Sequence, residues 1–317
     1  MQHGSPRIQA TLLLAGLVTM TSAACTTTGG QKSSQEADSP VPAVVAPAVP
    51  TVPVIANTLD RGLPVEKYLI TPEENSRIDR GWARLVSVCM KRFGLDYEPV
   101  VHESQKRTGQ TAHRYDPTDP GVATTRGYHG EVTGDEDRTP PPESMSPDVR
   151  LVLGSGSGSP NSPGAAKESR FQGITIPPGG CAGEAQETIR AGGGIFQDAQ
   201  VAIDINFGNY KRSMADERVQ EVFRKWSACM KASGFDYRTP TDAANNRAWN
   251  SPTPSSTEKE TAVADVRCKQ ESNVVGVWFS VESSYEEQDI AGKLQELTRV
   301  RESIDITLRN AATVPLK

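Results

Sequence analysis

Two short stretches of this chain repeat each other around a cysteine, and no other feature limits its fold as strongly. Residues 87–97 (Ser-Val-Cys-Met-Lys-Arg-Phe-Gly-Leu-Asp-Tyr) and residues 227–237 (Ser-Ala-Cys-Met-Lys-Ala-Ser-Gly-Phe-Asp-Tyr) are identical at seven of eleven positions. Chance is a poor explanation for that agreement, so we interpret it as an internal duplication. The sequence therefore predicts a body built from two related halves.

Each stretch closes an amphipathic segment that carries the signals of a helix. Residues 71–74 (Thr-Pro-Glu-Glu) form a capping box with proline at the first helical position, and Gly94 is typical of a helix C-terminus. The second segment runs from near Ser213 to Gly234. Apolar residues at helical spacing line one face of each segment: Ile78, Trp82, Leu85, Cys89 and Phe93, then Val219, Val222, Phe223, Trp226, Cys229 and Met230. Because both tryptophans have apolar neighbours, core packing is favoured over an aromatic ligand site.

The cysteines predict how this body is held together. The chain has five, Cys25, Cys89, Cys181, Cys229 and Cys268, and each repeated stretch is followed by one further cysteine. A duplicated unit with its own bridge favours Cys89–Cys181 and Cys229–Cys268, each stabilising the fold by roughly 4 kcal/mol on chain-entropy grounds. The alternative, Cys89 bridged to Cys229 across a pseudo-twofold axis, stays open. The lack of a Cys-x-x-Cys sequence disfavours thioredoxin-type redox chemistry.

Residues 1–24 have the pattern of a secretion signal. Arg7 supplies a positive start, residues 8–20 form an apolar run too short to span a bilayer, and small residues precede Cys25. Because such residues are typical of lipoprotein processing, we expect Cys25 to carry a lipid that anchors the chain on the outer face of the cytoplasmic membrane. The other four cysteines can then form two bridges in an oxidising compartment. Ser22 replaces the usual aliphatic lipobox residue, and a freely secreted protein is the alternative.

Composition divides the rest of the chain. Residues 25–62 are rich in proline, threonine and glycine, so we expect a flexible linker of polyproline character. Residues 98–176 contain three consecutive prolines and a glycine-serine run without an apolar stripe, which predicts a flexible insert. The folded domain comprises its first half, residues 63–97, and its remainder, residues 177–317. The predicted class is all-α: a small disulfide-stapled helical domain with a long disordered N-terminal tether and an internal insert.

Two further helices are expected in the remainder of this domain. Between residues 196 and 210 apolar side chains recur at helical spacing; residues 201–207 also alternate like a strand, and we favour the helix. From about residue 274 to residue 310 the helical spacing continues without a proline, which predicts one long helix. Trp278 and Tyr285, seven residues apart on it, are the candidates for a partner-facing stripe, and core packing is the competing interpretation.

No pattern of catalytic or metal-ligating residues emerges from the sequence. The histidines are expected in the cleaved signal or as solvated residues of the insert: His3, His102, His113 and His129. A carboxylate cluster is interpreted as a solvated helix face: Glu282, Glu286, Glu287 and Asp289. The glycine-serine run that starts at Gly154 matches neither a phosphate loop nor a nucleophile elbow. The net charge of −5 argues against nucleic-acid binding, and no cofactor or metal is expected.

The two Cys-Met-Lys-x-x-Gly stretches, with Arg114-Tyr115 and Gly127-Tyr128 between them, resemble uncharacterised secreted lipoproteins of actinobacteria. Those proteins similarly pair a lipobox with a tryptophan-flanked Cys-Met motif, as at residues 226–230 (Trp-Ser-Ala-Cys-Met). The resemblance implies a location in the cell envelope and no particular activity. It also implies that the segment from Arg114 to Tyr128 is ordered against the body.

We therefore expect a non-enzymatic cell-envelope lipoprotein, a binding or accessory module attached to the membrane through its N-terminal lipid. Its partner would be an unknown envelope protein or a wall component. The main alternative is a secreted or wall-associated enzyme, which a cluster of buried polar groups would favour. A purely structural spacer is a third interpretation, and it would have neither a pocket nor an exposed apolar patch.

Overall fold

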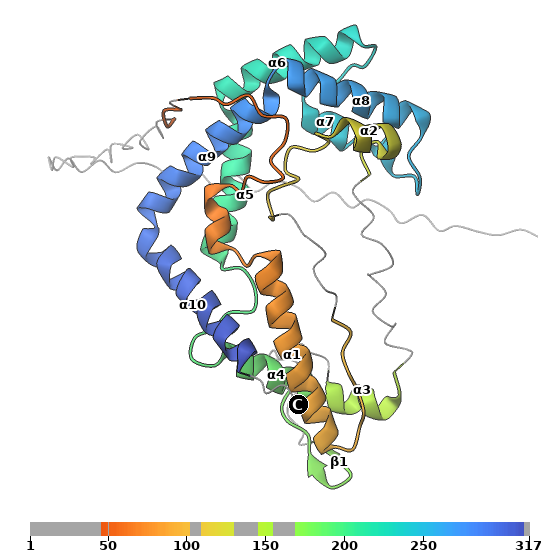
Figure 1. Cartoon of the computed structure of the whole chain (residues 1–317), viewed down its shortest axis with the longest axis vertical. Helices are drawn as coiled ribbons and strands as arrows, with labels where there is room; N and C mark the ends of the chain where they lie inside the picture. The colour runs from red at the N-terminus through yellow and green to blue at the C-terminus, as the bar shows by residue number, and fades with distance from the viewer. Residues whose placement is uncertain (1–45, 50, 102–108, 130–144, 155–168, 314–317) are drawn as a thin grey trace, which may run out of the picture. The chain divides into compact units, whose positions relative to one another are not determined.

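The computed structural model describes residues 46–49, 51–101, 109–129, 145–154 and 169–313 (Figure 1). These residues form helices and one two-stranded antiparallel hairpin, which confirms the predicted helical class. The predicted signal, its lipidation cysteine and more than half of the predicted linker lie outside the described residues. None of the described helices combines the length and the apolar composition needed to cross a bilayer.

The elements in chain order are η1 (Pro64–Tyr68), α1 (Pro72–Arg92), α2 (Pro120–Arg126), α3 (Pro147–Leu153), β1 (Arg170–Phe171), β2 (Ile174–Thr175), α4 (Gly180–Arg190), α5 (Gln200–Ala215), α6 (Glu217–Ala232), α7 (Pro240–Ala244), η4 (Arg247–Trp249), α8 (Ser256–Glu271), α9 (Val274–Gly292) and α10 (Leu294–Ala312). Here η marks a short 3-10 helix, and β1 pairs with β2 so that Phe171 lies opposite Ile174.

Helix α1 begins on the signals that its sequence predicts. The Thr71 hydroxyl accepts the backbone N–H of Glu74 at 3.2 Å, and the Glu74 carboxylate accepts the N–H of Thr71 at 2.9 Å. This reciprocal pair is a capping box, and it satisfies two of the donors that a helix start leaves without partners. Pro72 occupies the first helical position, where its missing N–H has no consequence.

Helices α1 and α6 end in the same way. Gly94 and Gly234 adopt positive φ angles of 71° and 90°, a conformation that glycine adopts without strain. The backbone N–H of the residue after each glycine, Leu95 or Phe235, then donates to the carbonyl of Met90 at 3.1 Å or of Met230 at 3.0 Å. This bond closes a Schellman-type cap, so the repeated Cys-Met-Lys-x-x-Gly sequence encodes a helix C-terminus.

Each of these helices is joined to a second helix by one disulfide bond. Cys89 of α1 is bonded to Cys181 of α4, and Cys229 of α6 is bonded to Cys268 of α8, with Cα atoms 5.5 and 5.6 Å apart. The pairing is the within-repeat pairing that the sequence favours. We call α1 with α4 the first stapled pair and α6 with α8 the second stapled pair.

Two helix boundaries differ from the sequence-based expectation. Helix α6 begins at Glu217 rather than near Ser213, because α5 continues through Ala215 and Asp216 then caps α6 by accepting the N–H of Arg218 at 2.9 Å. The long helix expected from residue 274 to residue 310 is two helices, α9 and α10. Lys293 leaves helical geometry after Gly292, a residue of low helix propensity, so the prediction of one helix was wrong.

Helix α9 contributes to the largest apolar cluster of the described residues. It contacts α5, α6 and α8, and the cluster includes Phe223 and Trp226 of α6 together with Trp278 of α9. Helix α10 packs instead against α1 and α4, where Ile304 and Leu308 join Ile78 of α1. The break between α9 and α10 therefore separates a helix that packs against the second stapled pair from one that packs against the first.

Parts of the ranges expected to be flexible are folded onto the body. In the expected linker, the Pro47 carbonyl accepts a hydrogen bond from Arg218 at 2.8 Å, and the Pro53 carbonyl accepts one from Asn273 at 3.0 Å. In the expected insert, α2 packs against α8 and α3 packs against α4. The prediction of flexibility is thus wrong for these described segments, because hydrogen bonds hold the linker residues while buried apolar side chains, Ala123 of α2 and Val152 of α3, pack onto the body.

Candidate functional site

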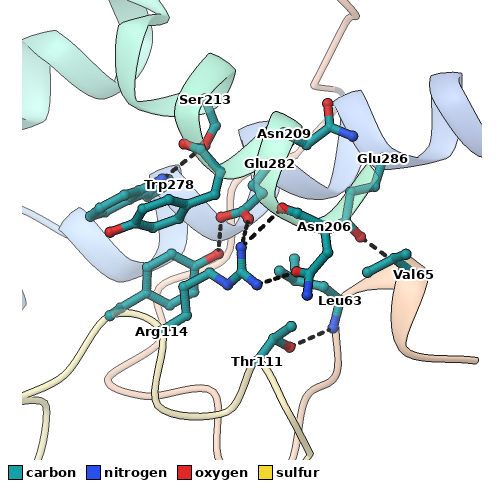
Figure 2. A network of polar contacts seen from close by, with 12 residues as sticks. Leu63, Val65, Thr111, Arg114, Asn206, Asn209, Ser213, Trp278, Glu282 and Glu286 are labelled. Carbon is teal, nitrogen blue, oxygen red and sulfur yellow. Dashed lines mark hydrogen bonds and ion pairs between the residues drawn. The ribbon is translucent and has the colours of Figure 1, made fainter. Parts of the chain in front are cut away.

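Trp278 and Tyr285, the residues that the sequence singles out as a partner-facing stripe, are both buried. Trp278 is 2% exposed, and its indole N–H donates to Ser213 Oγ at 2.9 Å (Figure 2). Tyr285 is 5% exposed, and its hydroxyl donates to Asp216 Oδ2 at 3.0 Å. The prediction of a partner-facing stripe is therefore wrong, and the competing core interpretation applies.

The carboxylate cluster of α9 divides between two faces of the helix. Glu287 is exposed and Asp289 is half-buried, but Glu282 and Glu286 are 0% exposed. The interpretation of the cluster as a solvated face was therefore wrong for Glu282 and Glu286. These two residues lie one turn apart, where η1 and residues 111–115 cover α9.

Arg114, from the expected insert, is the partner of Glu282. Its guanidinium lies 2.6 Å from Glu282 Oε1 and also donates to the side chain and the carbonyl of Asn206, while the Tyr115 hydroxyl donates to Glu282 Oε2 at 2.8 Å (Figure 2). Burial raises the pKa of Glu282 to about 7, and Arg114 and Tyr115 oppose that rise by stabilising the charged form. Of the two buried carboxylates, Glu282 has the guanidinium contact and the lower pKa, so it is the first of the two to ionise as the pH rises.

Glu286 is the second buried carboxylate, and no cationic side chain of the described residues pairs with it. Its Oε2 accepts the backbone N–H of Val65 at 2.9 Å, and its Oε1 has no hydrogen-bond partner among the described residues. Burial is the main reason that the pKa of Glu286 is raised to about 8; the hydrogen bond from the Val65 N–H opposes the rise, and the charge of Glu282 contributes to it. Glu286 is consequently protonated at neutral pH.

Arg114, Tyr115, Asn206, Glu282 and Glu286 form what we call the buried clamp. Its carboxylates have no exposed surface, and the Arg114 donors described above bind protein acceptors. The clamp therefore presents no group to a ligand. It fixes the segment around Arg114 and the start of η1 onto α5 and α9.

A pocket lies elsewhere, where the end of the same insert segment meets the chain between α7 and α8. Its volume is about 270 Å³, slightly below the roughly 300 to 1,000 Å³ of typical ligand-binding pockets. Ala244 and six larger residues line it: Tyr128, His129, Asn245, Asn246, Trp249 and Asn250. The rings of Tyr128 and Trp249 are nearly parallel, at 12°, with centroids 5.7 Å apart.

His129 is held at both ring nitrogens. Nδ1 lies 2.8 Å from Glu258 Oε1 and Nε2 lies 2.8 Å from the carbonyl oxygen of Ser251. Two acceptors require two N–H donors, so the bonds to the Ser251 carbonyl and to Glu258 raise the pKa of His129 by favouring the imidazolium. The expectation of a solvated loop histidine is wrong, since only 25% of this side chain is exposed.

Helix α8 supplies the buried polar groups behind the pocket. Glu258 is fully buried and accepts the backbone N–H of Tyr128 at 2.9 Å as well as His129. Further along α8, Lys269 donates to the carbonyls of Tyr115 and Pro117, at 3.0 and 3.1 Å, and lies 3.1 Å from Asp265 Oδ2. The ionic groups of α8 thus bind the insert at two places, at residues 115–117 and at residues 128–129.

The polar groups of the pocket are held by the protein itself. They converge on a preformed cavity, but the one histidine has both nitrogens committed to protein acceptors. Across the described ranges, no group of three or more histidine, cysteine, aspartate or glutamate residues is arranged to hold a metal ion. The arrangement can accommodate a small ligand through aromatic faces and carboxamides.

Sequence reasoning missed most of this site. Gly127-Tyr128 was noted only through the resemblance, and His129, two residues after Gly127, was assigned to solvent. A local signal does exist: with Gly127 at a φ of 61°, a Cβ would lie 2.5 Å from Glu258 Oε1, so glycine permits the close approach. Asn-rich residues 245–250 carry no periodic signal, and only the fold brings them to the insert. Comparisons with protein families, with curated proteins and with solved structures find no match to this chain.

Proposed function

We propose that this chain is an exported, lipid-anchored binding module of the bacterial cell envelope, and that it captures its ligand in the pocket beside His129. The single observation that carries the proposal is the pocket itself, a preformed polar cavity whose histidine is locked by Glu258 and Ser251. A site ordered before binding loses little conformational entropy when a ligand enters. A purely structural spacer has no need of such a cavity.

The proposed location rests on the cysteines. Two disulfide bonds are typical of an oxidising compartment outside the cytoplasm. They use four of the five cysteines, and Cys25 is the fifth. Lipid attachment at Cys25 accounts for this odd residue, and the described chain from residue 46 onward would then be held close to the membrane surface.

The tether is tested by labelling producing cells with an alkyne fatty acid. The protein is expected to take up the label and to fractionate with membranes, whereas a Cys25→Ser variant should do neither. A label-free wild-type protein in the medium would favour the freely secreted alternative.

The binding function is tested with a photocrosslinking amino acid at position 250, on the rim of the pocket, in intact producing cells. Position 75, an exposed asparagine of α1, provides the matched control. One recurrent adduct at position 250 that is missing at position 75 supports the proposal. Adducts that are equal at both positions, or absent from both, contradict it.

The two stapled pairs are also proposed to descend from one duplicated unit. The supporting features are the equivalent disulfide bonds, the shared glycine cap, and Met90 and Met230, each with no exposed surface. Swapping residues 87–97 for residues 227–237 tests this descent. Related units should accept the swap with native disulfide pairing, and unrelated ones should scramble it.

A wall-acting enzyme is the second candidate, and the pairing of His129 with Glu258 favours it. A histidine oriented by a carboxylate is the arrangement of a general base. Here, however, Nε2 is bonded to the Ser251 carbonyl, and the Ser251 hydroxyl donates to the Thr253 carbonyl at 2.7 Å. Release of soluble fragments from purified walls, abolished by His129→Ala, would establish the enzyme in place of the binding module.

A further inference from the structure

We propose that the pocket binds an uncharged saccharide, with a sugar ring packed on the Tyr128 and Trp249 side and its hydroxyls bonded to the neighbouring asparagines. This inference rests on the proposed binding function and names the class of its ligand. It follows from the charge, the shape and the hydrogen-bonding groups of the lining.

The charge of the pocket selects a neutral ligand. As far as the structure describes it, the lining contains no aspartate, glutamate, lysine or arginine. The imidazolium of His129 is paired with Glu258, so its charge is already balanced, and both of its N–H groups donate to protein acceptors. A phosphate or carboxylate would therefore find neither a free cation nor a free imidazole N–H here.

The aromatic rings of Tyr128 and Trp249 stack on each other and supply the smaller, apolar part of a mainly polar lining. The indole N–H of Trp249 donates to the Ala243 carbonyl at 2.7 Å, which fixes the orientation of the ring. Tyr128 lies nearly parallel to Trp249, and its backbone N–H is bound by Glu258. A pyranose ring presents a face of C–H groups, and this face is complementary to the electron-rich face of an aromatic ring.

The asparagines supply the polar groups that would bind the hydroxyls of a sugar. Asn245, Asn246 and Asn250 line the same cavity, and a carboxamide carries both donors and acceptors. Sugar hydroxyls are also both donors and acceptors, so adjacent hydroxyls pair with amides without requiring a charge. Asn246 is held in place because its Nδ2 donates to the Tyr237 hydroxyl at 2.8 Å and its Oδ1 accepts the Ala248 N–H at 3.0 Å.

The size of the cavity fits a short ligand. A volume of about 270 Å³ accommodates one sugar ring, and two of the asparagines, Asn245 and Asn250, are exposed at the surface. A longer glycan can therefore place one residue in the pocket while its neighbours extend into solvent. A peptide is the competing occupant, since it also pairs with carboxamides, and it forms one arm of the test.

The test uses the full-length protein extracted from producing cells in a zwitterionic detergent without a sugar headgroup. The neutral probes are triacetylchitotriose, maltotriose, mannotriose and arabinotriose. The comparison probes are a trisaccharide that contains glucuronic acid and a trialanine amide. Saturation-transfer NMR identifies the probes that bind, and calorimetry gives each Kd.

Three variants locate the binding. Trp249→Ala is expected to weaken the binding of the best neutral trisaccharide at least about tenfold, because the stacking surface is lost. Trp249→Phe keeps a ring and should stay within about threefold of the wild type. Asn250→Ala tests the polar groups, and Asn75→Ala, on the exposed face of α1, is the control that should change nothing.

Each outcome decides between the two proposals. Neutral trisaccharide binding that Trp249→Ala removes supports the saccharide assignment. Binding of the peptide in place of the neutral trisaccharides, with the same dependence on Trp249, overturns the saccharide class. Binding of the charged trisaccharide in their place overturns the assignment of an uncharged ligand. Both results leave the binding function intact. Saccharide binding that is indifferent to Trp249 and Asn250, or no binding by any neutral probe, overturns the assignment, and the crosslinking at position 250 then judges the binding function separately.

Discussion

The two stapled pairs share a disulfide bond and a glycine cap, but they bury different chemistry. In the first pair, the residue after the second cysteine is Ala182, whose carbonyl accepts a weak hydrogen bond from the Trp82 indole at 3.4 Å. In the second pair, the equivalent residue is Lys269, which is buried beside Asp265 and bound to two carbonyls of the insert. The buried polar groups of the second pair thus bind the insert that forms one wall of the pocket, while the ion pair of the first pair, Arg92 with Glu184, lies at the surface.

The difference teaches how one supersecondary unit can serve two purposes. The helix end and the bridge depend on a few local residues, and both pairs keep them. The buried ionic groups lie on α8, and they hold Tyr115, Pro117 and Tyr128 of a distant segment. Stability is therefore expected to respond alike in the two pairs when the shared features are changed, and unequally when the neighbouring residues are changed.

The largest inequality is expected at the position three residues before each first cysteine, which holds Val86 in α1 and Trp226 in α6. Both side chains are 0% exposed, and the Trp226 indole N–H donates to Asp265 Oδ1 at 2.9 Å. Trp226→Ala should lower the free energy of unfolding by about 5 kcal/mol, since it opens a large cavity and removes a partner of a buried carboxylate. Val86→Ala should cost about 2 kcal/mol. Guanidinium denaturation measures both, and equal losses would contradict the contrast.

The disulfide bonds are expected to come next. Substituting both Cys89 and Cys181 by alanine should lower the free energy of unfolding by about 4 kcal/mol, and so should substituting both Cys229 and Cys268. The sequence separations are 92 and 39 residues, so the first pair should lose more by about 0.8 kcal/mol if loop-closure entropy dominates. A larger loss in the second pair would show that native packing around α8 outweighs that entropy.

The pH dependence of stability should originate on the side of the second pair, where α9 contacts α6. The pKa values of Glu282 and Glu286, about 7 and about 8, exceed their unfolded values of about 4.3. The folded state thus binds more protons in this window, and stability falls as pH rises from about 4.5 to 8. Glu286→Gln should reduce the fall between pH 5 and pH 8 by about 2 kcal/mol, a discounted figure for a buried group.

The control for this pH dependence is Glu184→Gln on α4, a half-exposed carboxylate that pairs with Arg92 in the first stapled pair. It should leave the slope of stability against pH unchanged. If Glu184→Gln flattened the slope as much as Glu286→Gln, the buried carboxylates of α9 would not be its source.

The smallest loss of stability is expected for the two glycine caps, and it should be the same in both. Gly94→Ala and Gly234→Ala each place a side chain at a positive φ, and a Cβ at either position would meet nothing within 4 Å. Each substitution should therefore cost about 1 kcal/mol from backbone strain alone. Thermal unfolding of the two variants checks the prediction. Losses that differ by more than the measurement error would mean that the two caps are not equivalent.

The sequence predicted local features well where the determining residues lie within one or two turns of each other. The capping box at Thr71 and the glycine ends at Gly94 and Gly234 follow from such short-range patterns. The disulfide pairing spans 92 and 39 residues, and it was favoured because each repeated stretch is followed by one further cysteine. The break at Lys293 was missed, because the spacing of apolar residues continues across it. Helix α9 ends at Gly292, a weak helix former, and the change of direction there lets α10 pack on α1.

The candidate site was less predictable than the fold. Its residues come from the end of the insert and from residues 244–250, two segments that carry no periodic pattern and lie more than a hundred positions apart. His129 and Glu282 were both assigned to solvent for a sound local reason, since charged residues of loops and helix faces are usually hydrated. Their burial depends on partners that no local pattern names: Glu258 for His129, and Arg114 for Glu282.

By itself, then, the sequence determined where helices α1 and α6 end and favoured the pairing of the cysteines that the structure has, because helix caps and the repeat of the cysteines depend on the identities of a few residues. Only the tertiary structure decided that Trp278 and Tyr285 face the core, that Glu282 and Glu286 are buried, and that His129 lines a pocket. The physical reason is that burial belongs to the contact between two segments. A helix face becomes interior only when another part of the chain covers it, and a buried charge is stable only where that other part supplies its partner.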